Sequence, residues 1–154
     1  MNIKDFPKTS DIILNYENGW LDIHLNNVEN RNALKQNLIK ELFTVFDVIR
    51  NNKHVRGVLI RGSNGIFCAG ADLKQMKKIA SSGSKAKGEA FDLSMVIGNL
   101  LKTINEAPQV VVSVTEGYAF AGGFGIACAS DLICLLYTSP SPRDLSTSRM
   151  PSSA

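Results

Sequence analysis

The chain has 154 residues, of which 44% are hydrophobic and 20% charged, a balance typical of one globular domain with a hydrophobic core. Its formal net charge is only +3 and its basic residues form no long run, which argues against nucleic acid or a membrane surface as a partner. Three cysteines without metal-ligand spacing indicate a reducing compartment and no metal site, and no apolar signal segment opens the chain, so we expect a cytoplasmic protein.

The first sixty residues predict a hairpin, a helix and a buried strand. Apolar and polar residues alternate on both sides of Asn18-Gly19, the dipeptide most typical of a two-residue hairpin turn. Residues 33–51 carry apolar side chains at helical spacing, and the run 57–60 predicts a short buried strand. This strand leads to the first of two glycine-containing turns, which reads Cys-Ala-Gly-Ala-Asp-Leu-Lys at residues 68–74.

A second strand–turn–helix unit follows a helical region. We expect a basic helix over residues 73–80, a flexible loop at 81–84 and an amphipathic helix over 91–104. Residues 110–114 predict another buried strand, and the second turn, Gly-Tyr-Ala-Phe-Ala-Gly-Gly-Phe-Gly, leads into a helix over 122–130. The repeated units predict an α/β fold with ligands at the strand ends.

The apolar run from residue 118 to 136 invites a membrane interpretation. Its length is barely enough to span a bilayer, and it contains a cluster of glycines and the acidic Asp131. We therefore interpret it as containing a buried helix of a globular core.

Composition changes abruptly after Ile133. Residues 134–154 are rich in serine and proline and lack periodicity, which predicts a disordered tail. Residues 134–144 and 148–154 also resemble the translation of a sequencing-library adapter, in one reading frame. We therefore expect residues 1–133 to be the N-terminal part of a domain that is truncated there, and residues 134–154 to be non-native.

The two glycine turns form the candidate site. Each follows a strand and opens a helix, so each presents free backbone N–H groups above the strand ends. Two such turns side by side can hold one oxygen between two N–H donors, the arrangement that stabilises an oxyanion. The alternative is that the glycines are only packing devices.

The nearby polar side chains have simpler interpretations. We interpret Asp72 as a helix cap and Cys68 as a small core residue. His24 and His54 lack a paired carboxylate or nucleophile in the sequence pattern, so both are expected to be structural or solvated.

These turns, together with Asn-Arg-Asn-Ala-Leu at residues 30–34, resemble the crotonase (enoyl-CoA hydratase/isomerase) superfamily. The resemblance covers residues 10–133, with the motifs in the family's order and spacing. It implies a ββα-repeat spiral core and an acyl-CoA thioester substrate. Coenzyme A enters as part of that substrate, with no further cofactor, and the full-length protein is expected to be a homotrimer or hexamer.

By position, the resemblance implies that the N–H groups of Ala71 and Gly122 form the oxyanion hole for the thioester carbonyl. Lys74 can offer its ammonium to the nucleotide or phosphates of coenzyme A, or it can be a solvated helix residue. Arg31 matches a position near the path of coenzyme A. The substrate-binding residues implied are Arg31, Ala69, Ala71, Asp72, Leu73, Lys74, Gly122 and Gly123.

One position departs from the family pattern. The best-known hydratases carry a glutamate three residues after the oxyanion-hole glycine, where this chain has Gly125, and a second glutamate that would lie beyond Ile133. Residues 106–131 are similar to hydratases of branched glutaconyl-CoA thioesters, the methylglutaconyl and isohexenylglutaconyl types, which also tend to lack the first glutamate.

The leading hypothesis is therefore a lyase that adds water to an α,β-unsaturated acyl-CoA. The alternatives are an enoyl-CoA isomerase and a catalytically weak member that binds acyl-CoA or RNA. The near-neutral charge makes RNA the least favoured ligand.

Overall fold

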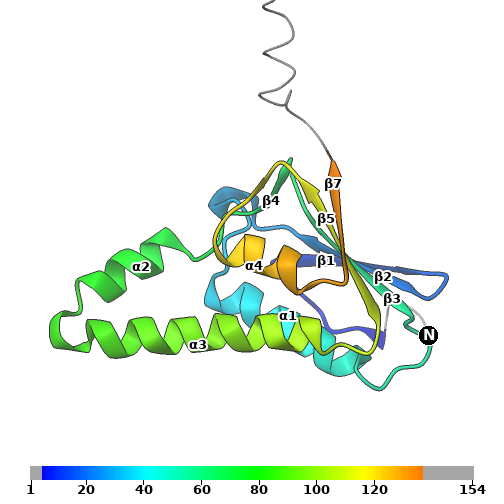
Figure 1. The fold of residues 1–154 in the computed structure, drawn as a ribbon, viewed down its shortest axis with the longest axis horizontal. Helices are drawn as coiled ribbons and strands as arrows, with labels where there is room; N and C mark the ends of the chain where they lie inside the picture. Colours follow the sequence, from blue (N-terminus) through cyan, green and yellow to red (C-terminus); the bar gives the residue numbers. More distant parts are fainter. Residues whose placement is uncertain (1–4, 137–154) are drawn as a thin grey trace, which may run out of the picture.

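The computed structural model describes residues 5–136, which form a five-stranded sheet with helices on one face (Figure 1). The strand order is β1-β2-β3-β5-β7; β1 pairs antiparallel with β2, and the other neighbours are parallel. The strands are β1 Ile12–Glu17, β2 Trp20–Leu25, β3 Gly57–Gly62, β5 Val110–Glu116 and β7 Leu132–Leu136. The predicted α/β class is confirmed.

The hairpin forms where the sequence predicts it. Asn18 and Gly19 have φ angles of 50° and 84°, so both turn residues adopt the left-handed conformation that a two-residue turn requires. Glu17 pairs with Trp20 across the turn.

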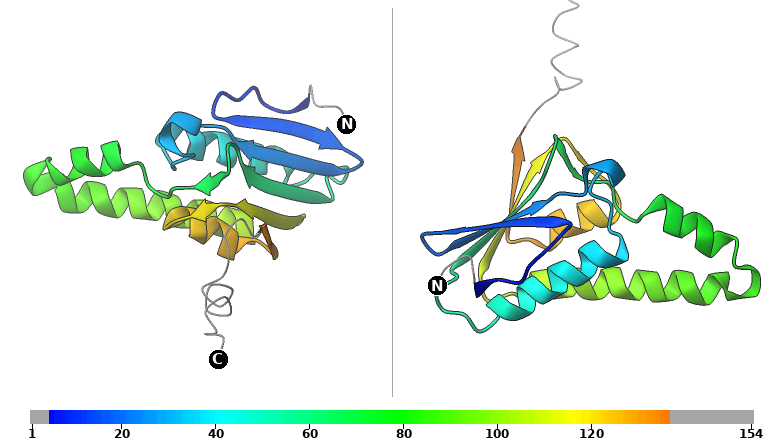
Figure 2. Two further views of the ribbon diagram at one scale, coloured as in Figure 1. Left: turned by 90° about the horizontal axis from the view of Figure 1, so that it is seen from above. Right: turned by 180° about the vertical axis from the view of Figure 1, so that it is seen from behind.

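The core lies between the sheet and the helices α1 Gln36–Ile49, α3 Ala86–Asn105 and α4 Gly122–Ala129, which share one side of the sheet (Figure 2). Alternate residues of β2 and β3, among them Leu21, Ile23 and Ile60, are fully buried against them. Polar residues such as Asp22 alternate with these on β2 and lie on the opposite face.

Helix α1 begins later than the predicted helix over 33–51. Ala33 and Leu34 precede it, and the Leu34 N–H donates to the Gly70 carbonyl at 2.7 Å. The apolar residues at this end therefore hold the chain against the first glycine turn instead of extending the helix.

Helix α2 occupies Leu73–Ala80, as predicted, but α3 starts well before residue 91. The short 3₁₀ helix η3 Gly83–Lys85 connects the two, within the region where we expected a flexible loop. Helix α2 and the first half of α3 project beyond the sheet (Figure 1), and Phe91 and Met95 are exposed. The sequence misses the start of α3 because a solvated helix needs no apolar stripe.

A separate two-stranded sheet carries both glycine turns. Strand β4 Ile66–Cys68 pairs in parallel with β6 Tyr118–Ala119, with a register shift between Ile66 and Cys68. A further 3₁₀ helix, η2 Val28–Asn30, precedes the Arg-Asn-Ala-Leu segment.

Strand β7 crosses the boundary that we drew at Ile133. Cys134, Leu135 and Leu136 pair with β5, so the expectation of an irregular tail fails for these three residues. The edge of β5 is free to pair, and an apolar run beside it can form a strand. The change in composition after Ile133 does not prevent this. The remaining tail, 137–154, lies outside the described residues.

No helix within residues 5–136 is both long and apolar enough to cross a membrane. The apolar run from residue 118 onward divides into β6, α4 and β7. Its helix α4 buries Gly123, Ile126 and Ala127 in the core, as expected for that part of the run.

Candidate active site

The two glycine turns lie directly against each other. Gly70 has a φ angle of +84°, and a Cβ on it would stand 2.7 Å from the Phe120 oxygen and 2.9 Å from the Ala121 Cβ. The Phe120 N–H donates to the Cys68 carbonyl at 3.0 Å. Segments about fifty residues apart in the sequence therefore meet main chain to main chain, and glycine at position 70 makes this approach possible.

At this contact two half-buried residues, Ala71 and Gly122, each have an available N–H group. Within residues 5–136, neither the Ala71 N–H nor the Gly122 N–H donates to a protein oxygen, whereas other N–H groups of both turns do. Ala69 donates to Arg31 at 3.1 Å, and Gly123 donates to Phe120 at 2.8 Å. Gly122 is the first residue of α4, where an N–H has no partner inside the helix and the helix dipole favours negative charge.

Ala121, immediately before Gly122, has a strained backbone. Its φ of 45° and ψ of −115° form a combination that a residue with a Cβ rarely adopts, at a cost on the order of 1–3 kcal/mol. The Gly125 N–H holds the Ala121 carbonyl at 2.9 Å. Strain of this kind is typical of sites where the direction of one peptide group matters.

Residues 30–34 hold the first turn in place. Arg31 and Asn32 both have positive φ angles, which directs the Arg31 carbonyl to the Ala69 N–H. Asn32 is fully buried, and its side-chain amide donates to the carbonyls of Ile66 at 2.7 Å and Ser63 at 3.2 Å. Sequence reasoning missed this role of Asn32; its signal is that asparagine tolerates the left-handed conformation better than most residues.

Asp72 caps α2, which confirms its interpretation as a helix cap. Its Oδ1 accepts the N–H groups of Lys74 at 2.7 Å and Gln75 at 3.2 Å, and its Oδ2 accepts the Asn30 amide at 3.1 Å. Only 8% of the residue is exposed. The carboxylate is thus occupied by structural hydrogen bonds.

The other predicted binding residues differ in their exposure to solvent. Ala69 is half-buried and Gly123 is buried, whereas Arg31, Leu73 and Lys74 are exposed. Leu73 is 76% exposed although it is apolar.

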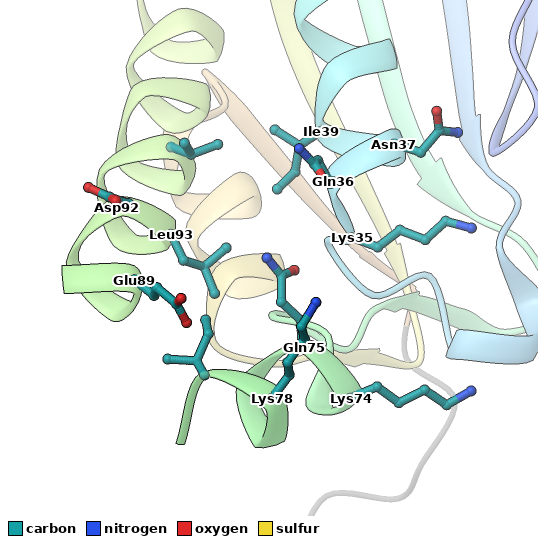
Figure 3. Close-up of a pocket in the computed structure, with 12 residues that line it drawn as sticks. Lys35, Gln36, Asn37, Ile39, Lys74, Gln75, Lys78, Glu89, Asp92 and Leu93 are labelled. Carbon is teal, nitrogen blue, oxygen red and sulfur yellow. The ribbon is translucent and has the colours of Figure 1, made fainter. Parts of the chain in front are cut away.

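A cleft of about 800 Å³ opens between α1, α2 and α3 (Figure 3). Ala71 and Gly122 do not line it, but Leu34 and Ile97, which would contact a Cβ on Gly122, adjoin lining residues in the chain. Its lining combines apolar side chains with charged ones, and Lys74 extends away from Leu93 and Glu89 in Figure 3. The lining residues are Lys35, Gln36, Asn37, Ile39, Lys74, Gln75, Lys78, Ile79, Glu89, Asp92, Leu93 and Val96.

Position 125 faces α3. A Cβ on Gly125 would stand 2.9 Å from the Leu101 Cδ1, so the Leu101 side chain fills the space into which a larger residue would extend. Helix α4 therefore offers no acid or base at this position.

His24 has a carboxylate partner, contrary to the expectation that it has none, although a structural role for it remains the interpretation. Its Nε2 lies 3.0 Å from the Asp22 Oδ2, and Asp22 also lies 3.2 Å from the Arg61 Nε. Residues two apart on a strand share a face, which brings this carboxylate to the histidine. The pair lies on the sheet face opposite the helices, so it does not join the two turns.

The comparisons with known proteins agree on one family for this chain. The family model described as enoyl-CoA hydratase/isomerase matches residues 15–140. Mitochondrial methylglutaconyl-CoA hydratase of Mus musculus is 35% identical over 115 residues, which are 74% of this chain and 35% of that protein. Ethylmalonyl-CoA decarboxylase of Mus musculus is 30% identical over 129 residues, which are 84% of this chain and 38% of that protein.

Solved structures share the fold. Pseudomonas aeruginosa AtuE superimposes with a TM-score of 0.74 at 36% identity, over 80% of this chain and 47% of that one. An enoyl-CoA hydratase/isomerase from Marinobacter aquaeolei gives 0.73 at 36% identity, with the same two coverages. The chain spans about a third of the length of the curated relatives it matches and about half of these solved chains.

Proposed function

We propose that the protein to which this chain belongs adds water to an α,β-unsaturated acyl-CoA. The chain belongs to the enoyl-CoA hydratase/isomerase family of the crotonase superfamily. In this proposal the N–H groups of Ala71 and Gly122 bind the thioester oxygen and stabilise the negative charge that develops on it. Coenzyme A is part of the substrate, and the full-length protein is a homotrimer or hexamer.

One observation carries the proposal: two turns in main-chain contact each present an N–H without a protein acceptor among the described residues. Fixed donors lower the energy of a developing oxyanion without reorganising during the reaction. The strained Ala121 backbone supports this use of the Gly122 N–H, since strain persists only where the surroundings impose it.

The proposed substrate-binding residues other than the two donors fall into two groups. Ala69, Asp72 and Gly123 shape the turns from which the donors project, and Gly123 lets α4 approach β4 closely. Arg31, Leu73 and Lys74 are exposed beside the first turn, where two cations and an apolar side chain suit the phosphates and nucleotide of coenzyme A.

The acyl group is proposed to be a branched glutaconyl group. The names of the relatives support this choice, since mitochondrial methylglutaconyl-CoA hydratases are among the most similar curated proteins. The ethylmalonyl-CoA decarboxylases match at comparable identity, so substrate assays should include an ethylmalonyl thioester beside the glutaconyl ones.

Ala71→Pro tests the oxyanion hole. The Ala71 N–H donates to no protein acceptor within residues 5–136, so removing it breaks no hydrogen bond among these residues. Proline therefore removes one donor, and we expect kcat for enoyl-CoA hydration to fall by about 10²–10³-fold. Loss of the enoyl-thioester ultraviolet absorbance measures the rate.

Ala71→Ser is the matched control, because it keeps the backbone N–H and has a side chain of similar size. It should retain activity within about threefold. Equal rates for Ala71→Pro and Ala71→Ser would show that this N–H does not act in catalysis.

Isomerisation of the double bond is the second candidate function. Gly125 and the Leu101 side chain leave no carboxylate on α4, and moving a double bond needs one base and no pair of groups to hold water. Reaction in H₂¹⁸O separates the two: a hydratase places ¹⁸O in its product, whereas an isomerase converts a 3-enoyl thioester to a 2-enoyl thioester without it.

A further inference from the structure

Cys68 lies beneath both glycine turns at the end of β4. The residue is fully buried, and two of its hydrogen bonds go to different turns. Its Sγ accepts the Gly70 N–H at 3.4 Å, and its carbonyl accepts the Phe120 N–H at 3.0 Å. One residue therefore holds segments that are far apart in the sequence.

Cys68 also sets how close α4 can come. A Cβ on Gly123 would stand 2.7 Å from the Cys68 Cβ and would also meet the Cys68 carbonyl. The second residue of α4 thus rests on Cys68 with no space between them. Gly123 directly follows the donor Gly122, just as Gly70 directly precedes the donor Ala71.

We propose that Cys68 is a positioning residue that fixes the placement of the Ala71 N–H relative to the Gly122 N–H. The inference rests on the proposed function, in which these two groups share one thioester oxygen. In this proposal Cys68 acts through Gly70, Phe120 and Gly123.

The thiol has no chemical role of its own here. Burial raises the pKa of Cys68 to about 11, and the Gly70 N–H offsets this only in part, so the thiol is protonated near pH 7. A protonated, buried thiol is a poor nucleophile. What matters is that its sulfur accepts one hydrogen bond and that its size fits under Gly123.

The first test compares Cys68→Ala, Cys68→Ser and the wild type with a chromophoric probe, 2,4-hexadienoyl-CoA. Donors that polarise the thioester carbonyl shift the absorption band of a conjugated probe to longer wavelength. Cys68→Ala removes the acceptor of the Gly70 N–H, and we expect it to lose at least half of this shift at saturating probe. Its kcat should fall roughly ten- to a hundredfold with KM nearly unchanged, since a small misplacement of catalytic groups has this effect.

Cys68→Ser keeps an acceptor atom of similar size and should restore the spectral shift and most of kcat. Val58→Ala is the packing control, because Val58 is equally buried and lies on β3 away from both turns. It should lower the unfolding midpoint while leaving the spectral shift intact. A full shift in Cys68→Ala, or an equal loss in Val58→Ala, would overturn the positioning role.

A second measurement separates this inference from the proposed function. Amide ¹H–¹⁵N spectra of the ligand-free chain should show the Ala71 and Gly122 resonances displaced in Cys68→Ala and near their wild-type positions in Cys68→Ser. If the wild type binds the probe without a shift, the oxyanion-hole proposal is wrong. Undisplaced amides in Cys68→Ala would instead refute the role of Cys68.

Discussion

Two neighbouring regions of the molecule are built on opposite principles. The turn junction, residues 30–34, 68–71 and 120–123, is held mainly by main-chain hydrogen bonds and by glycines packed against backbone, supported by the buried side chains of Asn32 and Cys68. The helical arm, residues 73–99, is held by side chains, and few of these are buried. Helix α2 buries Ile79, and the first buried residue of α3, Leu100, lies just beyond the arm.

This difference separates two tasks of a binding site. Donors for a developing charge must not move, and a junction made of main-chain contacts fixes them. A cleft that receives a substrate benefits from walls that open at low energy, and segments with few buried contacts are those that open most readily. The arm contributes α2 and α3 to the walls of the cleft in Figure 3.

The largest effect should come from Gly70→Ala in the turn junction. An alanine there must adopt a φ of +84° and place its Cβ 2.7 Å from the Phe120 oxygen, so the conformational and steric costs add. We expect a loss of about 3 kcal/mol in the free energy of unfolding, measured by urea denaturation.

Gly83→Ala in the helical arm is the matched control. Gly83 also has a positive φ, +63°, but nothing lies within 4 Å of a Cβ built on it. Only the conformational cost of about 1 kcal/mol applies. Equal losses for the two variants would mean that the junction is no tighter than the arm.

Asn32→Ala should have the next largest effect. It removes the amide that donates to the Ile66 and Ser63 carbonyls and the oxygen that accepts the Asn27 N–H, all around a fully buried side chain. Leaving buried groups unpaired should cost about 2 kcal/mol in the free energy of unfolding.

Asn99→Ala, on the exposed side of α3, provides the comparison for Asn32→Ala and should change stability by less than about 0.5 kcal/mol. A similar loss at both positions would contradict the assignment of Asn32 as the support of the first turn.

Asp72→Ala should give the smallest of the three effects, at the boundary between the two regions. It removes the cap of α2 and should cost about 1 kcal/mol, with faster hydrogen exchange confined to α2. Asp92→Ala, an exposed aspartate inside α3, should leave both quantities unchanged. If Asp72→Ala instead accelerated exchange across β4 and β6, the junction would depend on the arm and the two regions would not be separate.

The sequence predicts those helices, strands and turns whose signals lie within the element itself. The Asn18-Gly19 hairpin, α2 and the buried strand β5 have turn dipeptides, caps or apolar runs of their own. The start of α3 and strand β7 were missed, because a projecting helix lacks an apolar stripe and β7 depends on the free edge of β5. The Asp22–His24 pair does have a local signal, because residues two apart on a strand share one face.

The sequence by itself determined the fold class, the family resemblance and the two glycine turns. Glycine marks these turns because Gly70 and Gly117 have positive φ angles and Gly123 lies where a Cβ would meet Cys68. Only the tertiary structure decided how those two turns lie relative to each other. It placed Gly70 against Phe120 and Ala121, set Cys68 beneath both turns and filled the space beside Gly125 with Leu101. Such contacts join residues tens of positions apart, and no local pattern encodes a distance between two segments that only the packed sheet and helices bring together.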